Sequence, residues 1–196
     1  MNKGFTVVEL VVSTGIIIVI LGMLFMGYPR FKARSALSAL AREVAITVRE
    51  AQVYGLAVKQ LGNEFPSYGI HISADKPKEI VLFGDYSSGD REDIYDSGKG
   101  CGSNQTETEC IRRITMIGQE YVEKICVNPG GAQETEEVCD IPELNITFKR
   151  PDPEAIIITD DNSVRYNAAK IYLRSSKDSR EQRVVRVWIT GQTSVQ

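Results

Sequence analysis

The chain has 196 residues, of which 42% are hydrophobic and 25% are charged, and its formal net charge is −3. This length suits one membrane segment plus one ordinary domain and is too short for two large catalytic domains. The composition excludes collagen-like, coiled-coil and intrinsically disordered chains. A cytosolic globular enzyme is disfavoured, because the first segment is too apolar to remain uncovered in water.

Charge is distributed unevenly along the chain. Residues 1–29 carry only Lys3 and Glu9 as charges, residues 30–60 carry a net charge of +4, and residues 61–196 carry −7. The chain therefore divides into an apolar N-terminus, a basic stalk and an acidic head.

The apolar N-terminus is long enough to cross a bilayer. The twenty residues from Leu10 to Pro29 carry no charge, and at about 1.5 Å per residue they span roughly 30 Å, the thickness of a hydrocarbon core. A cleaved secretory signal peptide would end in a small-residue site of the Ala-x-Ala kind, which the Met-Gly-Tyr-Pro-Arg that closes this run fits poorly. A plain signal anchor leaves Glu9 unexplained, since a carboxylate at the edge of an apolar helix is costly without a partner.

Residues 3–10 read KGFTVVEL, and this segment resembles the leader and mature start of type IV pilins and pseudopilins. That family has a short basic leader ending in Gly, then Phe, then Thr or Ser, with Glu as the fifth residue after the cut. The resemblance implies a leader over residues 1–4, with Lys3 keeping it cytoplasmic. It also implies that a prepilin peptidase/methyltransferase cuts between Gly4 and Phe5 and methylates the new Phe5 amine.

The same resemblance gives Glu9 a role in assembly. In a filament, Glu9 of one subunit is expected to neutralise the Phe5 amine of a neighbour. Because an unpaired buried charge is costly, this pair would enforce the register of assembly rather than add much net stability.

The polymerisation helix of residues 5–29 is predicted to continue as an amphipathic helix over residues 30–61, with a stop at Gly62-Asn63. Apolar residues at spacings of three and four form one helical face, expected to pack on the head's own sheet: Leu37, Leu40, Ala41, Val44, Val48 and Ala51. Pro29 lacks an N–H and must kink or break the helix, and Gly22 weakens the same stretch. A locally melted segment over residues 22–29 and a kink in a continuous helix both remain open.

The head, residues 62–196, is predicted to be rich in β-strands. Short runs bounded by Gly, Pro, Asp or Asn clusters qualify as strands: residues 68–73, 79–83, 121–127, 144–150, 155–159, 168–174 and 183–190. One amphipathic helix followed by antiparallel strands indicates an α+β fold, with a long N-terminal helix packed on an antiparallel sheet. The resemblance implies that this is the pilin fold.

Within the family, the head is most similar to GspH/FimT-type minor pseudopilins. The shared features are a basic, Ala-rich helix, an early strand, a Leu-Phe-Gly-Asp run before an acidic turn, and a closing strand followed by Gly191. An insertion of about residues 97–142 has no counterpart. DNA-binding pilins of this type carry a basic Gly-Arg-x-Arg tail, whereas this chain ends in Gly-Gln-Thr-Ser-Val-Gln, which puts DNA uptake in doubt.

Four cysteines, Cys101, Cys110, Cys126 and Cys139, fall within the insertion. There is no Cys-x-x-Cys pair and only one histidine, so a structural zinc site is not expected. If the head lies outside the cytoplasm, the oxidising environment there would convert these thiols to disulfides. Of the three possible pairings we favour Cys101–Cys110 with Cys126–Cys139, which close the shortest loops.

Residues 85–96 gather five acids around turn residues. Oxygen-rich loops of this kind can bind Ca²⁺, and the candidate ligands are Asp85, Asp90 and Asp93. The spacing does not fit the helix-loop-helix calcium pattern and Arg91 lies among the ligands, so we expect a solvated acidic turn without metal.

The sequence contains no phosphate-binding glycine loop, no Gly-x-Ser-x-Gly motif and no metal motif, so neither an enzyme nor a cofactor is expected. We expect a structural minor pilin or pseudopilin of a type II secretion system or a type IV pilus. A major pilin and a DNA-binding competence pseudopilin are the alternatives, and the head's net charge opposes DNA binding. A signal-anchored soluble domain that never polymerises is a third class.

The expected partners are the prepilin peptidase, other pilin or pseudopilin subunits, an inner-membrane assembly platform and membrane lipid. The expected location is a single pass through the inner membrane with the head outside the cytoplasm, followed by a periplasmic pseudopilus or a cell-surface pilus.

Overall fold

The computed structural model describes residues 6–57, 59–61, 65–86, 92–96, 101, 109–128, 137–160 and 164–196. The predicted leader with Lys3 and Gly4, the predicted mature N-terminus Phe5 and the calcium candidate Asp90 lie outside the described residues. In the described part, one long helix is followed by strands that form two antiparallel sheets. The architecture is therefore α+β, as the sequence predicts.

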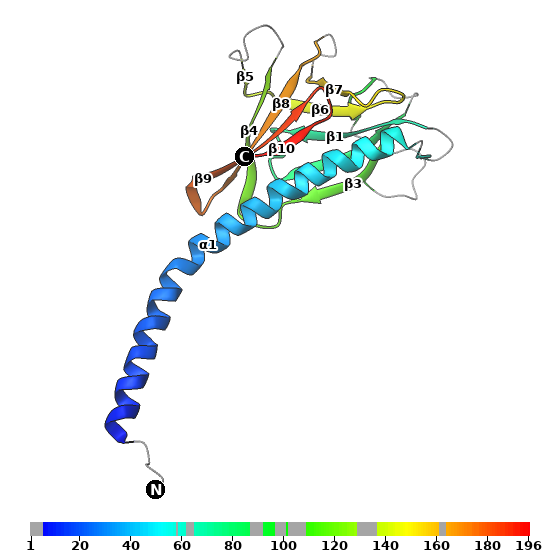
Figure 1. The fold of residues 1–196 in the computed structure, drawn as a ribbon. Helices are drawn as coiled ribbons and strands as arrows, with labels where there is room; N and C mark the ends of the chain where they lie inside the picture. Colours follow the sequence, from blue (N-terminus) through cyan, green and yellow to red (C-terminus); the bar gives the residue numbers. More distant parts are fainter. Residues whose placement is uncertain are drawn as a thin grey trace.

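The helix α1 (Val7–Leu56) is 50 residues long. Its backbone is helical throughout residues 22–29, so of the two expectations for this stretch the structure has the continuous helix. The direction of its axis changes between the half that stands free of the head and the half that lies on it (Figure 1).

The helix ends five residues before the predicted end at residue 61. Beyond the helix, the Lys59 carbonyl accepts a hydrogen bond from the Tyr68 hydroxyl at 3.0 Å, and the Lys59 ammonium lies 3.2 Å from the centre of the Tyr54 ring. These contacts tie the chain back toward the first strand, which the helical pattern of the sequence does not reveal.

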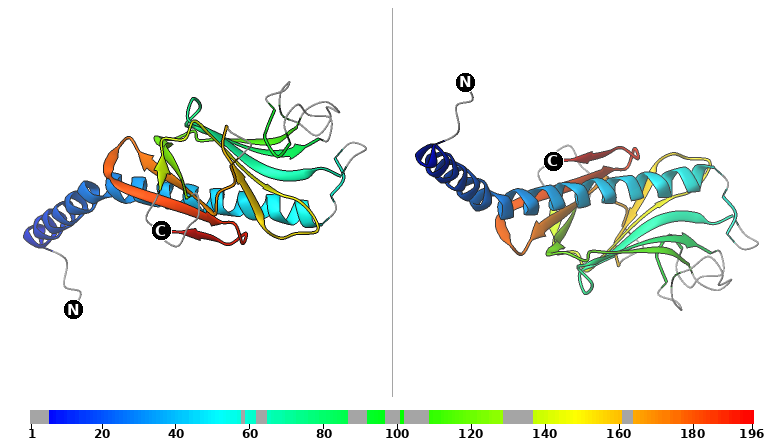
Figure 2. Two further views of the ribbon diagram at one scale, coloured as in Figure 1. Left: turned by 90° about the horizontal axis from the view of Figure 1, so that it is seen from above. Right: turned by 90° about the horizontal axis from the view of Figure 1, so that it is seen from below.

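The head contains two five-stranded sheets where the sequence predicted one. The first has the order β3 (Cys110–Thr115), β2 (Glu79–Asp85), β1 (Ser67–Ser73), β6 (Glu143–Phe148) and β7 (Ala155–Ile158). The second has the order β10 (Thr193–Val195), β9 (Asp178–Trp188), β8 (Ala168–Ser175), β4 (Glu120–Asn128) and β5 (Val138–Cys139). The two sheets lie side by side along the C-terminal half of α1 (Figure 2).

The core lies between α1 and the two sheets. The predicted apolar face of the helix is confirmed, since all six of its residues are at most 8% exposed. Helix and sheet approach closely at Gly55, where a Cβ atom would overlap the carbonyl oxygen of Phe148 in β6. This position therefore requires glycine for packing.

The segment predicted as an insertion, residues 97–142, contributes to both sheets. It supplies the edge strand β3 to the first sheet and the interior strand β4 to the second. Ile114, Val122, Ile125 and Val127 of this segment are at most 9% exposed and belong to the main core. The segment is therefore part of the folded head and not an appendage to it. The strand Cys110–Thr115 was not predicted, because the consecutive arginines Arg112 and Arg113 interrupt its alternation of apolar and polar residues.

Candidate functional site

The N-terminal half of α1 has an exposed apolar surface. Residues Val7–Phe25 have a mean hydropathy of 2.6, and none of this stretch is buried against the rest of the chain. Val7 is 79% exposed and Phe25 is 73% exposed. This helix is long and apolar enough to span a membrane, and contact with lipid or with other subunits would remove its apolar surface from water.

Glu9 lies in the first turn of this helix and closes its N-terminus. Its carboxylate accepts hydrogen bonds from the Thr6 backbone N–H at 3.2 Å and the Thr6 hydroxyl at 3.0 Å, while the Glu9 N–H donates to the Thr6 hydroxyl at 3.3 Å. This capping box satisfies helix donors that otherwise lack a partner, and the negative charge complements the helix dipole. The described structure therefore places the Glu9 carboxylate at the start of the exposed helix, next to the predicted cleavage point.

The outer face of the packed half of α1 is basic and partly apolar. Arg42 and Arg49 are exposed, and Ile46 and Val53 on the same face are 64% and 58% exposed. These two arginines therefore lie away from the buried apolar face of the helix. This face offers bases and apolar groups to a neighbouring molecule.

Two disulfides are present, Cys101–Cys110 and Cys126–Cys139, with Cα–Cα distances of 4.7 and 4.0 Å. They are the pairs that close the shortest loops. Glu137 lies with Cys126 and Cys139 in a group whose potential metal-ligating atoms are within 4.8 Å of one another. Because both sulfurs are joined to each other, this group offers no thiolate to a metal.

Two of the three candidate calcium ligands in the predicted acidic turn are buried. Asp85 is 7% exposed and Asp93 is 3% exposed, so the expectation of a solvated turn is wrong for both. The Asp85 carboxylate accepts hydrogen bonds from the Asp93 N–H at 2.8 Å and from the Ser67 hydroxyl at 3.3 Å. The Asp93 carboxylate lies at the same distance, 3.3 Å, from the Ser67 hydroxyl, whose single proton the two carboxylates share, and it accepts from the Thr147 hydroxyl at 3.4 Å. Two hydroxyls of the sheet and one backbone N–H thus take the place of water at these carboxylates.

Burial perturbs the proton affinity of Asp85 and of a second carboxyl, Glu109. Burial raises the pKa of Asp85 to about 6 and the pKa of Glu109 to about 7. The Glu109 carboxylate, 6% exposed as a residue, accepts a hydrogen bond from the Asp96 N–H at 2.6 Å. A second atom of Asp85, Oδ1, is buried and has no hydrogen-bond partner among the described residues, which fits a group that is held partly protonated near neutral pH.

The segment 92–96 covers the face of the first sheet that points away from α1. Ile94 is fully buried, and Tyr95 contacts Phe83 at a ring-centre distance of 5.4 Å and His71 at 5.0 Å. The Tyr95 N–H donates to the side-chain oxygen of Asn145 at 3.2 Å. The buried polar residues Ser67, Asn145, Thr147 and Glu109 were not predicted from the sequence. The adjacent Ile-Tyr pair inside the acidic turn was the available signal.

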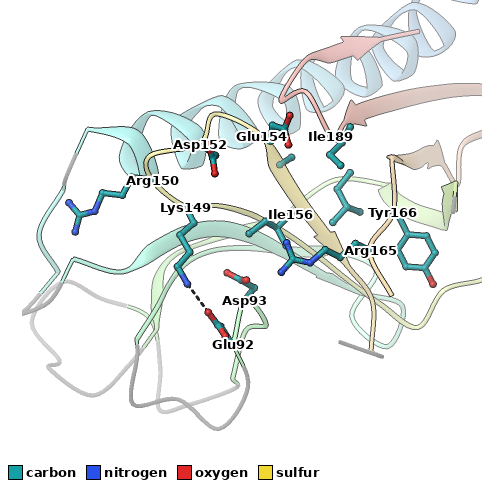
Figure 3. Close-up of a pocket in the computed structure, with 12 residues that line it drawn as sticks. Glu92, Asp93, Lys149, Arg150, Asp152, Glu154, Ile156, Arg165, Tyr166 and Ile189 are labelled. Atoms are coloured by element: carbon teal, nitrogen blue, oxygen red, sulfur yellow. Dashed lines mark hydrogen bonds and ion pairs between the residues drawn. The ribbon is translucent and has the colours of Figure 1, made fainter. Parts of the chain in front are cut away.

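A pocket of about 260 Å³ opens beside this cluster, between β7 and the segment that starts at Glu92 (Figure 3). Lys149 donates to Glu92 at 2.6 Å, and the Arg165 side chain extends toward Asp93 and Ile156 (Figure 3). Charges of both signs surround an apolar floor, but the described lining residues include no Ser, Cys or His that could act as a nucleophile or base. The lining residues are Glu92, Asp93, Lys149, Arg150, Asp152, Glu154, Ala155, Ile156, Ile157, Arg165, Tyr166 and Ile189.

Five bases lie close together in the sequence near the C-terminus, Arg174, Lys177, Arg180, Arg183 and Arg186. The structure divides them between different surfaces. Arg174 pairs with Glu123 at 2.5 Å, while Arg183 turns to the helix and donates to the Ser38 hydroxyl at 3.2 Å. Arg186 lies over the Trp188 ring at 4.6 Å. The stretch therefore does not form one continuous row of unpaired bases, which is the pattern that favours phosphate binding.

Comparisons of the chain with protein-family models, with curated proteins and with solved structures find no match.

Proposed function

We propose that this chain is a structural, non-enzymatic subunit of a type II secretion pseudopilus or a type IV pilus, most similar to the GspH/FimT-type minor pseudopilins. The observation that carries the proposal is the continuity of α1. One half is apolar and wholly exposed, and the other half packs on the head with its basic face outward. Such a helix anchors the subunit in a membrane first and then packs against other subunits in a filament.

The residues before α1 supply the processing site. The peptidase cuts between Gly4 and Phe5, with Lys3 on the cytoplasmic side, and the α1 segment crosses the inner membrane once. The head lies outside the cytoplasm, where the two disulfides form and persist. An assembly platform in the inner membrane then moves the subunit into the filament.

Glu9 acts at the step of assembly. In the free subunit its carboxylate is satisfied by Thr6 of its own chain. In the filament it exchanges this neutral partner for the Phe5 amine of a neighbour, and an amine and a carboxylate in a dry environment attract more strongly than a neutral pair. A subunit placed out of register leaves a buried charge without a partner.

The proposal is tested with Glu9→Ala in the full chain, with Glu43→Ala as the matched control, because Glu43 is exposed on the part of α1 that lies outside the membrane. Both variants are expected to be processed and to remain in the membrane fraction. Glu9→Ala is expected to be depleted severalfold from sheared filaments, whereas Glu43→Ala is incorporated as the wild type is. Normal incorporation of Glu9→Ala contradicts the proposed role of the carboxylate.

A further inference from the structure

One end of the head carries bases next to the point where α1 leaves it. The Arg34 guanidinium pairs with Glu181 at 2.5 Å, and the Arg183 guanidinium donates to the Ser38 hydroxyl at 3.2 Å. These contacts hold the hairpin of β8 and β9 against the first turns of the packed half of α1. Figures 1 and 2 show this hairpin beside the helix at the end of the head that faces the free half. We call this end the basal edge and define it by Lys32, Arg34, Ile117, Lys177 and Arg180.

The basal edge lies close to the boundary of the apolar helix. The uncharged run of the sequence ends at Pro29, and Arg34 follows five residues later, which is about 7.5 Å along a helix. The polar layer of one leaflet is roughly 5–8 Å thick. Tyr28 and Phe31, 62% and 71% exposed, flank this boundary, in the manner of aromatic residues at a membrane interface.

The loop between β3 and β4 belongs to the same edge. The Ser176 N–H in the turn of the β8–β9 hairpin donates to the Gln119 carbonyl at 2.9 Å, and the Lys78 ammonium donates to the Gly118 carbonyl at 3.2 Å. Ile117, which directly precedes these two contacts in the loop, is 98% exposed. A large apolar side chain fully in water beside bases is the arrangement found where proteins bind the surface of an anionic membrane.

The sign of the local charge matches such a surface, although the head as a whole is acidic. Lys32, Lys177 and Arg180 are exposed at the edge. The acid Glu181 is matched by Arg34 at 2.5 Å and by Arg183 at 3.7 Å. The nearby turn between β1 and β2 adds Lys76 and Lys78 against Asp75, and the adjoining segments add the acids Glu120 and Asp178. The bases of the edge and its neighbouring turns still outnumber the acids.

We propose that the head docks through its basal edge onto the anionic phospholipid headgroups of the membrane that α1 spans. This inference rests on the proposed membrane-anchored subunit. Lys177 and Arg180 bind lipid phosphates, and Ile117 inserts between headgroups. Docking fixes the orientation of the head before assembly, so that extraction of the subunit into a filament must first break these contacts.

The test uses the full chain in two kinds of lipid nanodisc, one of phosphatidylcholine alone and one that also contains phosphatidylglycerol. Hydrogen exchange is measured for the backbone amides of residues 116–119 and 176–180. Each base near an anionic leaflet strengthens binding roughly fivefold, so severalfold slower exchange is expected in the anionic discs and the difference is expected to shrink at high salt. The double variant Lys177→Glu/Arg180→Glu is expected to abolish the difference. Arg165→Glu, which reverses an exposed base three residues before the start of β8, is expected to preserve it.

The docking is overturned if residues 116–119 and 176–180 exchange equally fast in the two discs while the amides of Val7–Phe25 stay protected. That result leaves the proposed membrane-anchored subunit intact. Loss of protection along Val7–Phe25 itself overturns the proposed membrane anchor and the docking with it. Slower exchange on addition of a DNA oligonucleotide in neutral discs, with no effect of phosphatidylglycerol, overturns lipid as the partner and identifies the edge as a nucleic-acid surface.

Discussion

The stability of the head should fall as pH rises from about 5 to about 8, because two buried carboxyls must lose their protons in that interval. Burial raises the pKa of Asp85 from 3.8 to about 6 and the pKa of Glu109 from 4.5 to about 7. In both cases the folded state binds the proton more tightly than the unfolded state. The resulting stabilisation is complete at acidic pH and is lost as pH rises through the raised pKa values.

The size of the effect follows from these values. Between about pH 5 and pH 8, the undiscounted shifts correspond to a loss of roughly 1 kcal/mol of unfolding free energy from Asp85 and roughly 3 kcal/mol from Glu109. Residual solvent near the cluster screens the carboxylates, so we reduce the sum by half, to about 2 kcal/mol. For a domain of this size that loss lowers the melting temperature by about 5 °C.

The assay is thermal unfolding of the full chain in detergent, followed by the fluorescence of Trp188, the single tryptophan of the sequence, which lies in β9 of the head. Asp85→Asn and Glu109→Gln mimic the protonated carboxyls, so each variant should flatten the decline with pH, Glu109→Gln more than Asp85→Asn. Asp75→Asn alters an exposed acid and should leave the slope unchanged. The differences between each variant and the wild type separate these two groups from the remaining titratable groups.

A wild-type melting temperature that rises between about pH 5 and pH 8, with the same slope in Asp85→Asn and Glu109→Gln, would refute the reasoning. It would mean that these carboxyls ionise in the folded head at their ordinary pKa, and so that segment 92–96 does not cover them in solution.

Gly55→Ala should lower the stability of the head by about 1–3 kcal/mol, because the added methyl group overlaps the Phe148 carbonyl oxygen. Gly22→Ala, with nothing within 4 Å of the new Cβ atom, should leave the stability unchanged. Equal melting temperatures for the two variants would contradict the helix–sheet packing. Joint replacement of Cys126 and Cys139 by Ser should cost about 2–4 kcal/mol, measured by denaturant unfolding. A free thiol at either position in the wild-type protein under non-reducing conditions would contradict the disulfide.

The helix and most of the strands could be predicted because each has a strong local pattern. The apolar face from Leu37 to Ala51 repeats with the helical period, and β1, β2, β4, β6, β7 and β8 match predicted runs to within two residues at either end. The strands β3, β5 and β10 were missed. The strand β5 has two residues and β10 has three, which is too short for alternation to be visible.

The buried acidic cluster could not be predicted because it depends on what covers the second face of a sheet. Acids, Ser and Asn at alternating positions normally face water, and the local sequence of β1 and β6 gives no indication that Tyr95 and Ile94 pack over them. By contrast, the candidate site at Glu9 depends on adjacent residues alone. The Thr6 hydroxyl and the Glu9 carboxylate, three residues apart, form a capping box through local geometry.

The most direct test of the proposed function is quantitative mass spectrometry of sheared surface filaments and of the inner-membrane fraction, recording the N-terminal peptide and this chain's share of filament protein. We expect an N-methylated Phe5 terminus in both fractions and a trace share of the filament. The same terminus in the dominant filament protein would make the chain the major subunit. A terminus at Met1 confined to the membrane would contradict the proposal that the chain is a processed filament subunit.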